Sequence, residues 1–282
     1  MLFELAIADA YGAGFEFNSE GLKYNDLSRY IKHPKHKGIP GRYTDDTQQS
    51  LAIAEAILED DPWTAQSLAS RLVEVFRRDP RKGYSSRVYS VLTKARTGSD
   101  LIMLLDSNSK SCGAAMRSVP IGLFKTEKEV LEKAALQAKI THNTSDAILS
   151  SQAVALLSHF FIYDLGEARK DLVSYLQEWL PAFTLGRKWK GKVSSDGLSV
   201  ARAAISTILH CDARTLSALL QKAISFGGDV DSVAAIAVGV ASCSSQQFLS
   251  DLPEHLILGL EDGDFGGTYL KALDEKLLTK YL

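Results

Sequence analysis

Two short segments of the chain place neighbouring carboxylates beside hydroxyl groups. Residues 44–47 read Thr-Asp-Asp-Thr and residues 227–232 read Gly-Gly-Asp-Val-Asp-Ser, and each segment precedes an apolar run with helical spacing. Carboxylate and hydroxyl oxygens are the ligands that hard divalent cations prefer, and glycine allows the backbone to approach an ion closely. The two segments together therefore predict a metal centre between two helix N-termini.

Each segment taken alone is also compatible with an ordinary helix N-terminus. In that interpretation Thr44 or Asp45 caps the helix, the acids face the positive end of the helix dipole, and Gln48 completes a capping box. If the four aspartates of the two segments converge, however, like charges a few ångströms apart cannot all remain ionised without a cation. An all-oxygen ligand set without a nearby His or Cys favours Mg²⁺, Mn²⁺ or Ca²⁺ over Zn²⁺, and two clusters suggest two ions.

The elements that must position these segments are helices. Nearly every periodic stretch has helical spacing, alternating β-branched runs are scarce, and no stretch has the pattern of a hairpin. We predict an all-α fold with roughly ten or more helices, in a single compact domain that spans residues 1–282. The longer expected helices cover residues 2–10, 47–59, 61–78, 84–97, 127–140, 145–163, 167–180, 199–210, 213–226, 233–240 and 269–281.

Three loop features are further candidates for a site. Loop 106–113 is rich in Ser, Asn and Gly ahead of a helix, so its backbone N–H groups could cradle a phosphate or form an ordinary turn. Glu16 follows a Gly-x-Gly turn between two phenylalanines; it is either an exposed residue or a carboxylate at a pocket rim, and spacing alone favours exposure. In loop 18–40, a proline separates His33 from His36, which favours solvent exposure over a ligand pair.

The composition excludes several classes of protein. A net charge of −2 gives no electrostatic footprint for nucleic acid or for an anionic membrane. The N-terminus lacks the basic region of a signal peptide, and the most apolar stretches, 146–163 and 232–243, contain polar residues or are too short to span a bilayer. Three widely spaced cysteines without a C-x-x-C pair fit reduced thiols in a cytosol. We therefore expect a cytoplasmic protein without membrane or sequence-specific nucleic-acid partners.

Five motifs, in order along the chain, resemble those of the ADP-ribosylglycohydrolase family, the family of dinitrogenase-reductase-activating glycohydrolase. They are A-D-A-Y-G-A-G-F-E-F at 8–17, Y-T-D-D-T at 43–47, G-A-A-M-R-x-x-P-I-G at 113–122, T-H at 141–142 and G-G-D-V-D-S-V-A-A at 227–235. The resemblance implies an all-α fold and a centre with two Mg²⁺ or Mn²⁺ ions. It also implies hydrolysis of the bond between the distal ribose of ADP-ribose and a modified acceptor, with ADP-ribose as the product.

The resemblance also implies residue roles. The metal-ligand positions are Thr44, Asp45, Asp46, Asp229, Asp231 and Ser232. The positions that bind the ligand, including the loop that holds the diphosphate, are Ser109, Ser111, Cys112, Gly113, Met116, His142 and Gly228. The catalytic candidates are Glu16 and Asp46, with Asp9 as the next acid. Three positions depart from the family. Ser232 stands where threonine is usual and keeps the hydroxyl, and Ala8 replaces the glycine before Asp9. Cys112 stands where asparagine is frequent, which places the affinity for a diphosphate in question.

Two other functions are compatible with parts of the sequence. A prenyl-diphosphate-type synthase uses D-D-x-x-D on a helix, but the position three residues after Asp46 is Gln49. A non-catalytic ADP-ribose-binding or structural member of the same fold would keep the scaffold without turnover. The complete set of metal-ligand positions favours an enzyme.

The loop after the third helix bears on the linkage that is cleaved. Arginine-directed relatives place an aspartate in this loop, whereas the present chain has Lys82 near that position and its nearest acid, Asp79, is surrounded by basic residues. A cationic loop repels a guanidinium leaving group and tolerates a neutral hydroxyl. We therefore predict that O-linked ADP-ribose, of the serine or ester type, is cleaved faster than arginine-linked ADP-ribose.

Overall fold

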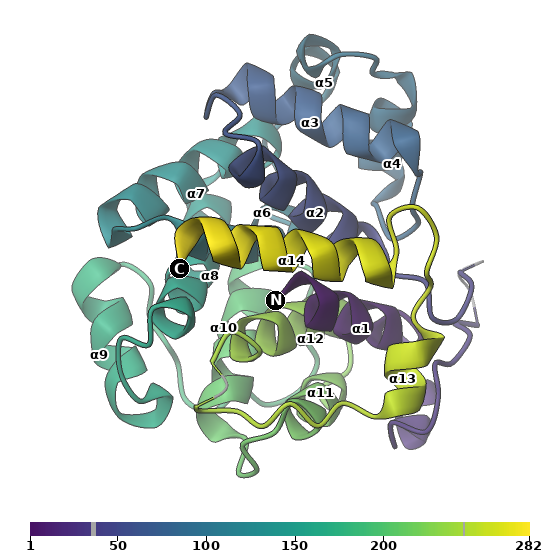
Figure 1. The fold of residues 1–282 in the computed structure, drawn as a ribbon, viewed down its shortest axis with the longest axis vertical. Coiled ribbons are helices and arrows are strands. Elements are labelled where there is room, and N and C mark those ends of the chain that lie inside the picture. Colours follow the sequence, from purple (N-terminus) through teal and green to yellow (C-terminus); the bar gives the residue numbers. More distant parts are fainter. Residues whose placement is uncertain (35–37, 245) are drawn as a thin grey trace.

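The computed structural model describes residues 1–34, 38–244 and 246–282, so His36 lies outside the described residues. Within these ranges the chain forms fourteen α-helices, two short 3₁₀-helices (Gly21–Tyr24 and Val119–Leu123) and only isolated β-bridges (Figure 1). The predicted all-α fold is confirmed. The helices are α1 (Leu2–Gly12), α2 (Asp45–Leu58), α3 (Ala65–Arg78), α4 (Ser86–Lys94), α5 (Gly98–Leu104), α6 (Gly113–Met116), α7 (Glu127–Thr141), α8 (Ser145–Ile162), α9 (Ala168–Trp179), α10 (Gly197–His210), α11 (Leu216–Ile224), α12 (Val230–Ala241), α13 (Glu254–Gly259) and α14 (Gly267–Tyr281).

Helix α12 lies at the centre of the fold, and all twelve of its residues are buried. Its small and β-branched residues allow the flanking helices α1, α8, α10 and α11 to pack closely around it. The contact with α1 is close, because a Cβ on Gly12 would lie only 2.5 Å from the Cα of Asp231. Glycine at this position therefore brings the end of α1 against the beginning of α12.

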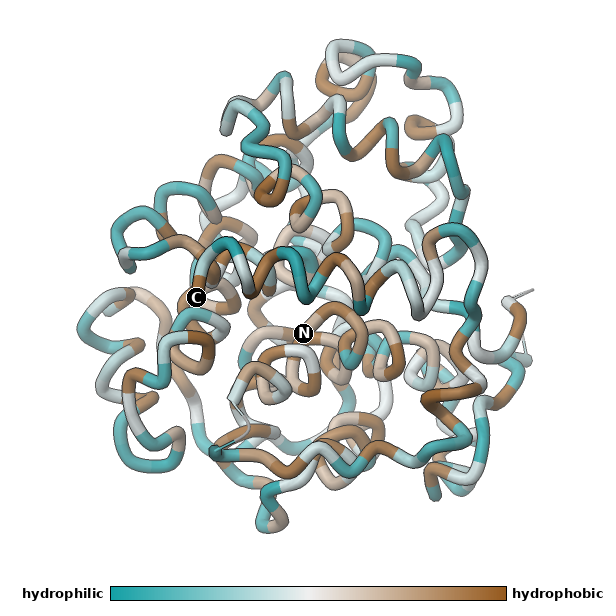
Figure 2. The backbone as a smooth tube through the Cα atoms, viewed as in Figure 1, coloured by the Kyte–Doolittle hydropathy of each residue, from teal (hydrophilic) through white to brown (hydrophobic). Residues whose placement is uncertain are grey.

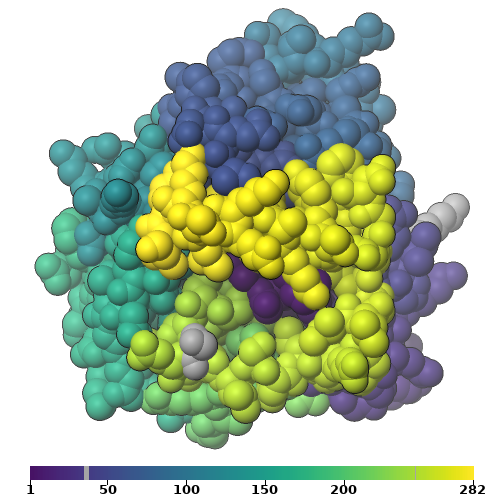
Figure 3. All heavy atoms as spheres, viewed as in Figure 1, coloured from purple at the N-terminus to yellow at the C-terminus, as the bar shows by residue number. Residues whose placement is uncertain are grey.

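Helix α8 also belongs to the core. By length and composition it could cross a membrane, but 72% of its 18 residues are buried within the protein, as in the core helix of a globular protein. The outer helices are amphipathic, and α3 and α14 alternate hydrophobic and hydrophilic turns in Figure 2. Helix α14 and the segment before it cover α1, of which only a small area is visible in Figure 3.

Two predicted boundaries are wrong for reasons of helix capping. The third helix begins at Ala65 and not near residue 61, because the Thr64 hydroxyl accepts a hydrogen bond from the N–H of Ser67 at 3.2 Å. The expected helix 84–97 is shorter in the structure, where α4 ends at Lys94 and a separate helix, α5, follows it. Gly98 does not end a helix but begins α5, since Thr97 and Asp100 form a reciprocal capping box in front of it.

Candidate active site

The N-termini of α2 and α12 meet beside the end of α1, and this brings five aspartates together. Asp45 and Asp46 are the first residues of α2, Asp229 is the N-cap of α12, Asp231 lies in its first turn, and Asp9 comes from α1. Two triads have ligand oxygens within 4.8 Å of one another: Asp9, Asp46 and Asp231 form one, and Glu16, Asp229 and Asp231 form the other. Residues more than 180 positions apart thus share one site.

Asp9 caps helix α2 from outside the helix. The expected local cap is wrong, because Thr44 occupies the N-cap position but accepts no hydrogen bond from the helix through its side chain. The Asp9 carboxylate accepts instead from the N–H groups of Thr44 (2.9 Å) and Thr47 (3.0 Å) and from both hydroxyls, at 2.7 and 2.5 Å. The signal in the sequence for this role was an aspartate in the mostly apolar helix α1.

The loop after α3 lies directly over the acids. The carbonyl of Lys82 accepts a hydrogen bond from the N–H of Asp45 at 3.0 Å. Gly83 has a φ of +104°, and a Cβ on it would lie 1.9 Å from Oδ1 of Asp45. Only glycine can therefore occupy position 83 while Asp45 keeps its place.

The aspartates lack compensating positive charge. Burial raises the pKa of all five, and repulsion from neighbouring acids adds to the increase for Asp45, Asp46 and Asp231. Among the described residues, none of the five forms an ion pair with Lys or Arg. The buried Oδ1 atoms of Asp46 and Asp231 have no hydrogen-bond partner among the described residues.

These observations test whether the residues fit divalent cations. Two unit charges 4 Å apart repel by about 4 kcal/mol at an effective dielectric constant of 20. The folded site must therefore take up protons or cations. An all-oxygen donor set with two buried carboxylate oxygens free to coordinate fits Mg²⁺ or Mn²⁺.

The acids open onto a cavity with an empty volume of about 850 Å³. From the predicted sets, its lining contains Glu16, Asp45, Asp46, Ser111, Cys112, Gly113, Met116, His142, Asp229, Asp231 and Ser232. Three predicted residues lie outside this lining. Thr44 lines a neighbouring cavity, Ser109 lies behind Ser111 at an Oγ–Oγ distance of 3.1 Å, and the carbonyl of Gly228 accepts a hydrogen bond from the N–H of Phe17 at 2.8 Å.

Cys112 faces the acid cluster. Its thiol donates to Oδ2 of Asp229 at 3.3 Å and lies 3.5 Å from the Ser232 hydroxyl. Burial and the negative charge of Asp229 raise the pKa of this thiol well above its usual value. A thiol that stays protonated is a poor nucleophile, so Cys112 lines the cavity and does not have the environment of a reactive cysteine.

Glu16 is half-buried and lies between the two cavities, so the exposed position expected from spacing is wrong. Its carbonyl forms a hydrogen bond with Nε2 of His33 at 2.7 Å. His33 is buried, so the predicted solvent exposure of this histidine is wrong. Burial and the charges of Asp229 and Asp9 raise the pKa of Glu16 to about 7. This carboxylate can therefore exchange a proton near neutral pH.

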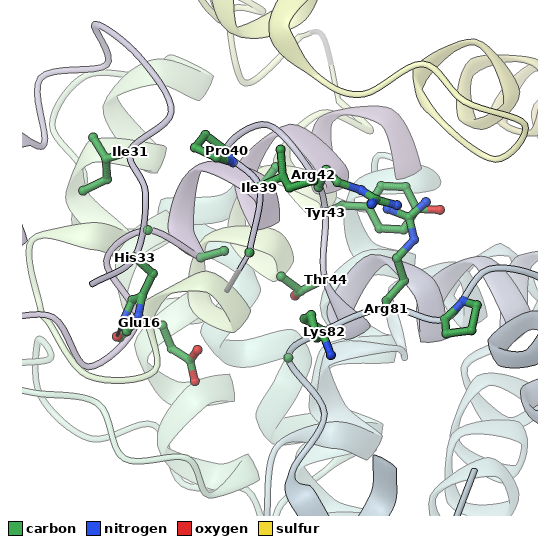
Figure 4. Close-up of a pocket in the computed structure, with 16 residues that line it drawn as sticks. Glu16, Ile31, His33, Ile39, Pro40, Arg42, Tyr43, Thr44, Arg81 and Lys82 are labelled. Atoms are coloured by element: carbon green, nitrogen blue, oxygen red, sulfur yellow. Dashed lines mark hydrogen bonds between the residues drawn. The ribbon is translucent and has the colours of Figure 1, made fainter. Parts of the chain in front are cut away.

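Figure 4 shows the neighbouring cavity, with Glu16 on one side and the loop that carries Arg81 and Lys82 on the other. Lys82 is exposed at this rim, and its Nζ lies 5.0 Å from the centre of the Tyr89 ring. Asp79, the acid of the same loop, is held by the guanidinium of Arg81, with Nε 2.8 Å from Oδ2, and by Arg42 at 3.8 Å. On the side of this loop, the cavity therefore has the exposed ammonium group of Lys82, whereas the carboxylate of Asp79 is already paired with arginine.

Comparisons with known proteins agree with this geometry. A model of the family described as ADP-ribosylglycohydrolase matches residues 1–281. The chain is 25% identical to ADP-ribosylhydrolase ARH3 of Homo sapiens over 280 residues, which covers 77% of each protein. It is 26% identical over 285 residues to an uncharacterised protein of Archaeoglobus fulgidus, covering 93% of this chain and 90% of that protein. A solved structure described as an ADP-ribosylglycohydrolase-related protein complex has the same fold, with a TM-score of 0.71 at 22% identity over 100% of this chain and 96% of that chain.

Proposed function

We propose that this chain, which belongs to the ADP-ribosylglycohydrolase family, removes ADP-ribose from a modified acceptor in a reaction that depends on divalent cations. The observation that carries the proposal is the cluster of five aspartates without a basic partner among the described residues, at the floor of a cavity. The relatives named ADP-ribosylhydrolase support the class of reaction.

The residues that would hold two Mg²⁺ or Mn²⁺ ions are Thr44, Asp45, Asp46, Asp229, Asp231 and Ser232. The Thr44 hydroxyl donates its proton to Asp9 at 2.7 Å, and this leaves oxygen lone pairs available for an ion. When bound, such ions neutralise the carboxylates and polarise the ligand oxygens that reach them.

Other residues around the cavity would transfer the proton and bind the diphosphate. Cleavage of a glycosidic bond passes through an oxocarbenium-like state and needs a carboxyl group that moves a proton. Glu16 has a pKa of about 7 and borders both cavities, so its acid form can donate a proton to the leaving acceptor and its carboxylate form can take one from the attacking water. Ser111 and the loop before α6 line the same cavity and would bind the diphosphate.

Cation binding should change the pH dependence of stability. Without divalent ions, the pKa of Glu16 rises from 4.5 to about 7 on folding, and the buried aspartates shift in the same direction. The folded protein then holds more protons than the unfolded protein, so its stability falls as the pH rises through this interval. We expect the melting temperature of chelator-treated protein to fall between about pH 4.5 and pH 7, and millimolar Mg²⁺ to raise it most at the upper end.

Thermal unfolding measured across this pH range, with and without Mg²⁺, tests the expectation. NaCl at the same ionic strength is the control, because it screens charge without occupying a site. Equal stabilisation by NaCl and Mg²⁺, or no stabilisation by either, would show that the aspartates do not form a specific cation site.

The linkage is tested by hydrolysis of serine-linked and arginine-linked ADP-ribosyl peptides of the same sequence. We expect faster release from serine, because Lys82 repels an arginine leaving group and Asp79 is already paired with Arg81 and Arg42. Asp79→Ala should leave the serine-to-arginine rate ratio unchanged, and Lys82→Ala should shift that ratio toward arginine.

The opposite results would change the assignment in specific ways. Faster release from arginine that disappears in Asp79→Ala would identify Asp79 as the acid that binds the guanidinium. Binding of ADP-ribose without turnover of either peptide would indicate a non-catalytic member of the family.

A further inference from the structure

Arg117, a buried residue that lines the floor of the cavity, joins the aspartates to the predicted diphosphate loop. Its side chain is 0% exposed, and all of its hydrogen-bond partners are neutral. It donates to the side-chain oxygens of Gln137 (2.5 Å), Gln49 (2.6 Å) and Thr141 (2.7 Å), and to the carbonyl of Gln137 (2.9 Å).

The hydrogen-bond chain continues beyond Thr141 to the cavity. Oγ1 of Thr141 lies 2.7 Å from Nδ1 of His142, and Nε2 of His142 lies 2.8 Å from Oγ of Ser111. The imidazole lies against Gly113: a Cβ at position 113 would lie 2.8 Å from Cε1 of the ring. Ser111 lines the cavity.

Arg117 determines which atom is the donor in each hydrogen bond of this series. A guanidinium has donors only, so Oγ1 of Thr141 must accept from it. The single hydroxyl proton of Thr141 then needs an acceptor, and among the described residues its only other partner is Nδ1 of His142. Nδ1 therefore carries no proton.

The second ring nitrogen of His142 must then be the donor. Burial and the positive charge of Arg117 lower the pKa of His142 to about 3, so the ring holds one proton at neutral pH. That proton is on Nε2, and it is donated to Oγ of Ser111. The Ser111 hydroxyl consequently keeps its own proton for the cavity, directly or through Ser109 at 3.1 Å.

The other end of the guanidinium has a similar effect on the acid cluster. Because Oε1 of Gln49 accepts from Arg117, the amide nitrogen of Gln49 must face Oδ2 of Asp45, at 3.5 Å. One side chain thus sets hydrogen-bond directions on both sides of the cavity.

We infer that Arg117 is a positioning residue: through Thr141 it holds His142 in the Nε2–H tautomer, which makes the Ser111 hydroxyl a donor to an anionic oxygen of the ligand. The inference rests on the proposed function for the identity of that ligand, a diphosphate. It makes the hydroxyl proton of Ser111 available to a ligand oxygen that carries no proton, such as an oxygen of a diphosphate.

Two measurements on the full-length protein test the inference. In ¹⁵N-histidine spectra without ligand, with the signals of His142 identified by their loss in His142→Gln, Nε2 should be protonated and Nδ1 unprotonated. In Thr141→Val the proton should no longer be confined to Nε2, and calorimetry should show ADP-ribose binding weakened about tenfold or more, as for a lost hydrogen bond to a charged group. Thr141→Ser keeps the hydroxyl and should restore both results.

A double-mutant cycle separates this role from a loss of packing. If Thr141 acts through Ser111, then Thr141→Val should cost little further affinity in a Ser111→Ala background. Thr207→Val is the matched control, because Thr207 is also buried and donates to a backbone carbonyl, that of Ala203, at 2.9 Å. Arg117→Lys keeps the charge but loses the forked donor geometry of the guanidinium, so it should have the same effect as Thr141→Val. Thr141→Val is the primary test, because removing a buried guanidinium endangers folding.

Three outcomes would overturn the inference: a proton on Nδ1 in the wild-type protein, unchanged ADP-ribose affinity in Thr141→Val, or additive effects in the cycle. Failure of the proposed function has a different signature. ADP-ribose binding without turnover would contradict the proposed hydrolysis, and no binding to the wild-type protein would contradict the identity of the ligand. In both cases the tautomer is still read from the spectra without ligand.

Discussion

Asp231→Asn should lose at least ~100-fold in turnover, the upper range for disturbing the ligand environment of a metal site. Asp231 contributes an oxygen to both acid triads, and its Oδ1 is buried without a partner among the described residues. Asparagine has the same shape but offers one neutral oxygen in place of a carboxylate. The variant should therefore fold normally and lose the proposed cation site.

Stability should change in the direction opposite to activity. The charge at Asp231 is opposed by Glu16, Asp229 and other neighbouring acids, so its removal relieves repulsion in the protein without cations. We expect the melting temperature of chelator-treated Asp231→Asn to equal or exceed that of the wild type, and the stabilisation by Mg²⁺ to be largely lost. Asp46 has the second buried oxygen without a partner among the described residues, so Asp46→Asn should behave in the same way.

Steady-state hydrolysis of an ADP-ribosyl peptide and thermal unfolding with and without Mg²⁺ measure both effects. Asp100→Asn is the matched control, because Asp100 lies in an exposed capping box of α5, away from the cavity. Activity within a few-fold of wild type together with a collapsed melting temperature would mean that the acids serve only to stabilise the helix ends.

Glu16→Gln should reduce the rate by at least ~10²-fold, the range typical of general acid–base catalysis, with little change in Mg²⁺ stabilisation. Glutamine keeps the shape of the side chain, including an oxygen, but cannot exchange a proton. The structure motivates this role because Glu16 borders both cavities and has a pKa of about 7. Bound cations would lower this pKa, so the pH–rate profile of the wild type should have an inflection below pH 7 that the variant lacks.

A wild-type rate in Glu16→Gln would transfer the catalytic role to another acid. Asp9 was the next candidate in the sequence, but both of its oxygens accept hydrogen bonds from the beginning of α2. In the structure Asp46 is therefore the stronger alternative, since its Oδ1 has no partner among the described residues.

Local signals in the sequence were sufficient for the all-α fold and for most helix boundaries. The central helices α8 and α12 follow from long apolar stretches, and the acid–hydroxyl segments at residues 44–47 and 227–232 mark two helix N-termini. Periodicity and capping act over a few residues, so they can be read from the chain directly. The five motifs were likewise sufficient to identify the family.

Tertiary structure alone decided how the site is completed. Asp9 caps a helix that begins 36 residues later, Gly83 lies against Asp45, and Arg117 joins Gln49 to Thr141. The sequence favoured exposure for Glu16 and solvation for His33, whereas the fold buries both at least partly beside the acids. These contacts join residues that are distant in the chain, so they depend on which helix faces pack together and not on any local propensity. The amino-acid sequence therefore determines which reactive groups are present. The packing of α1, α2, α6 and α12 determines their pKa values and their hydrogen-bond partners.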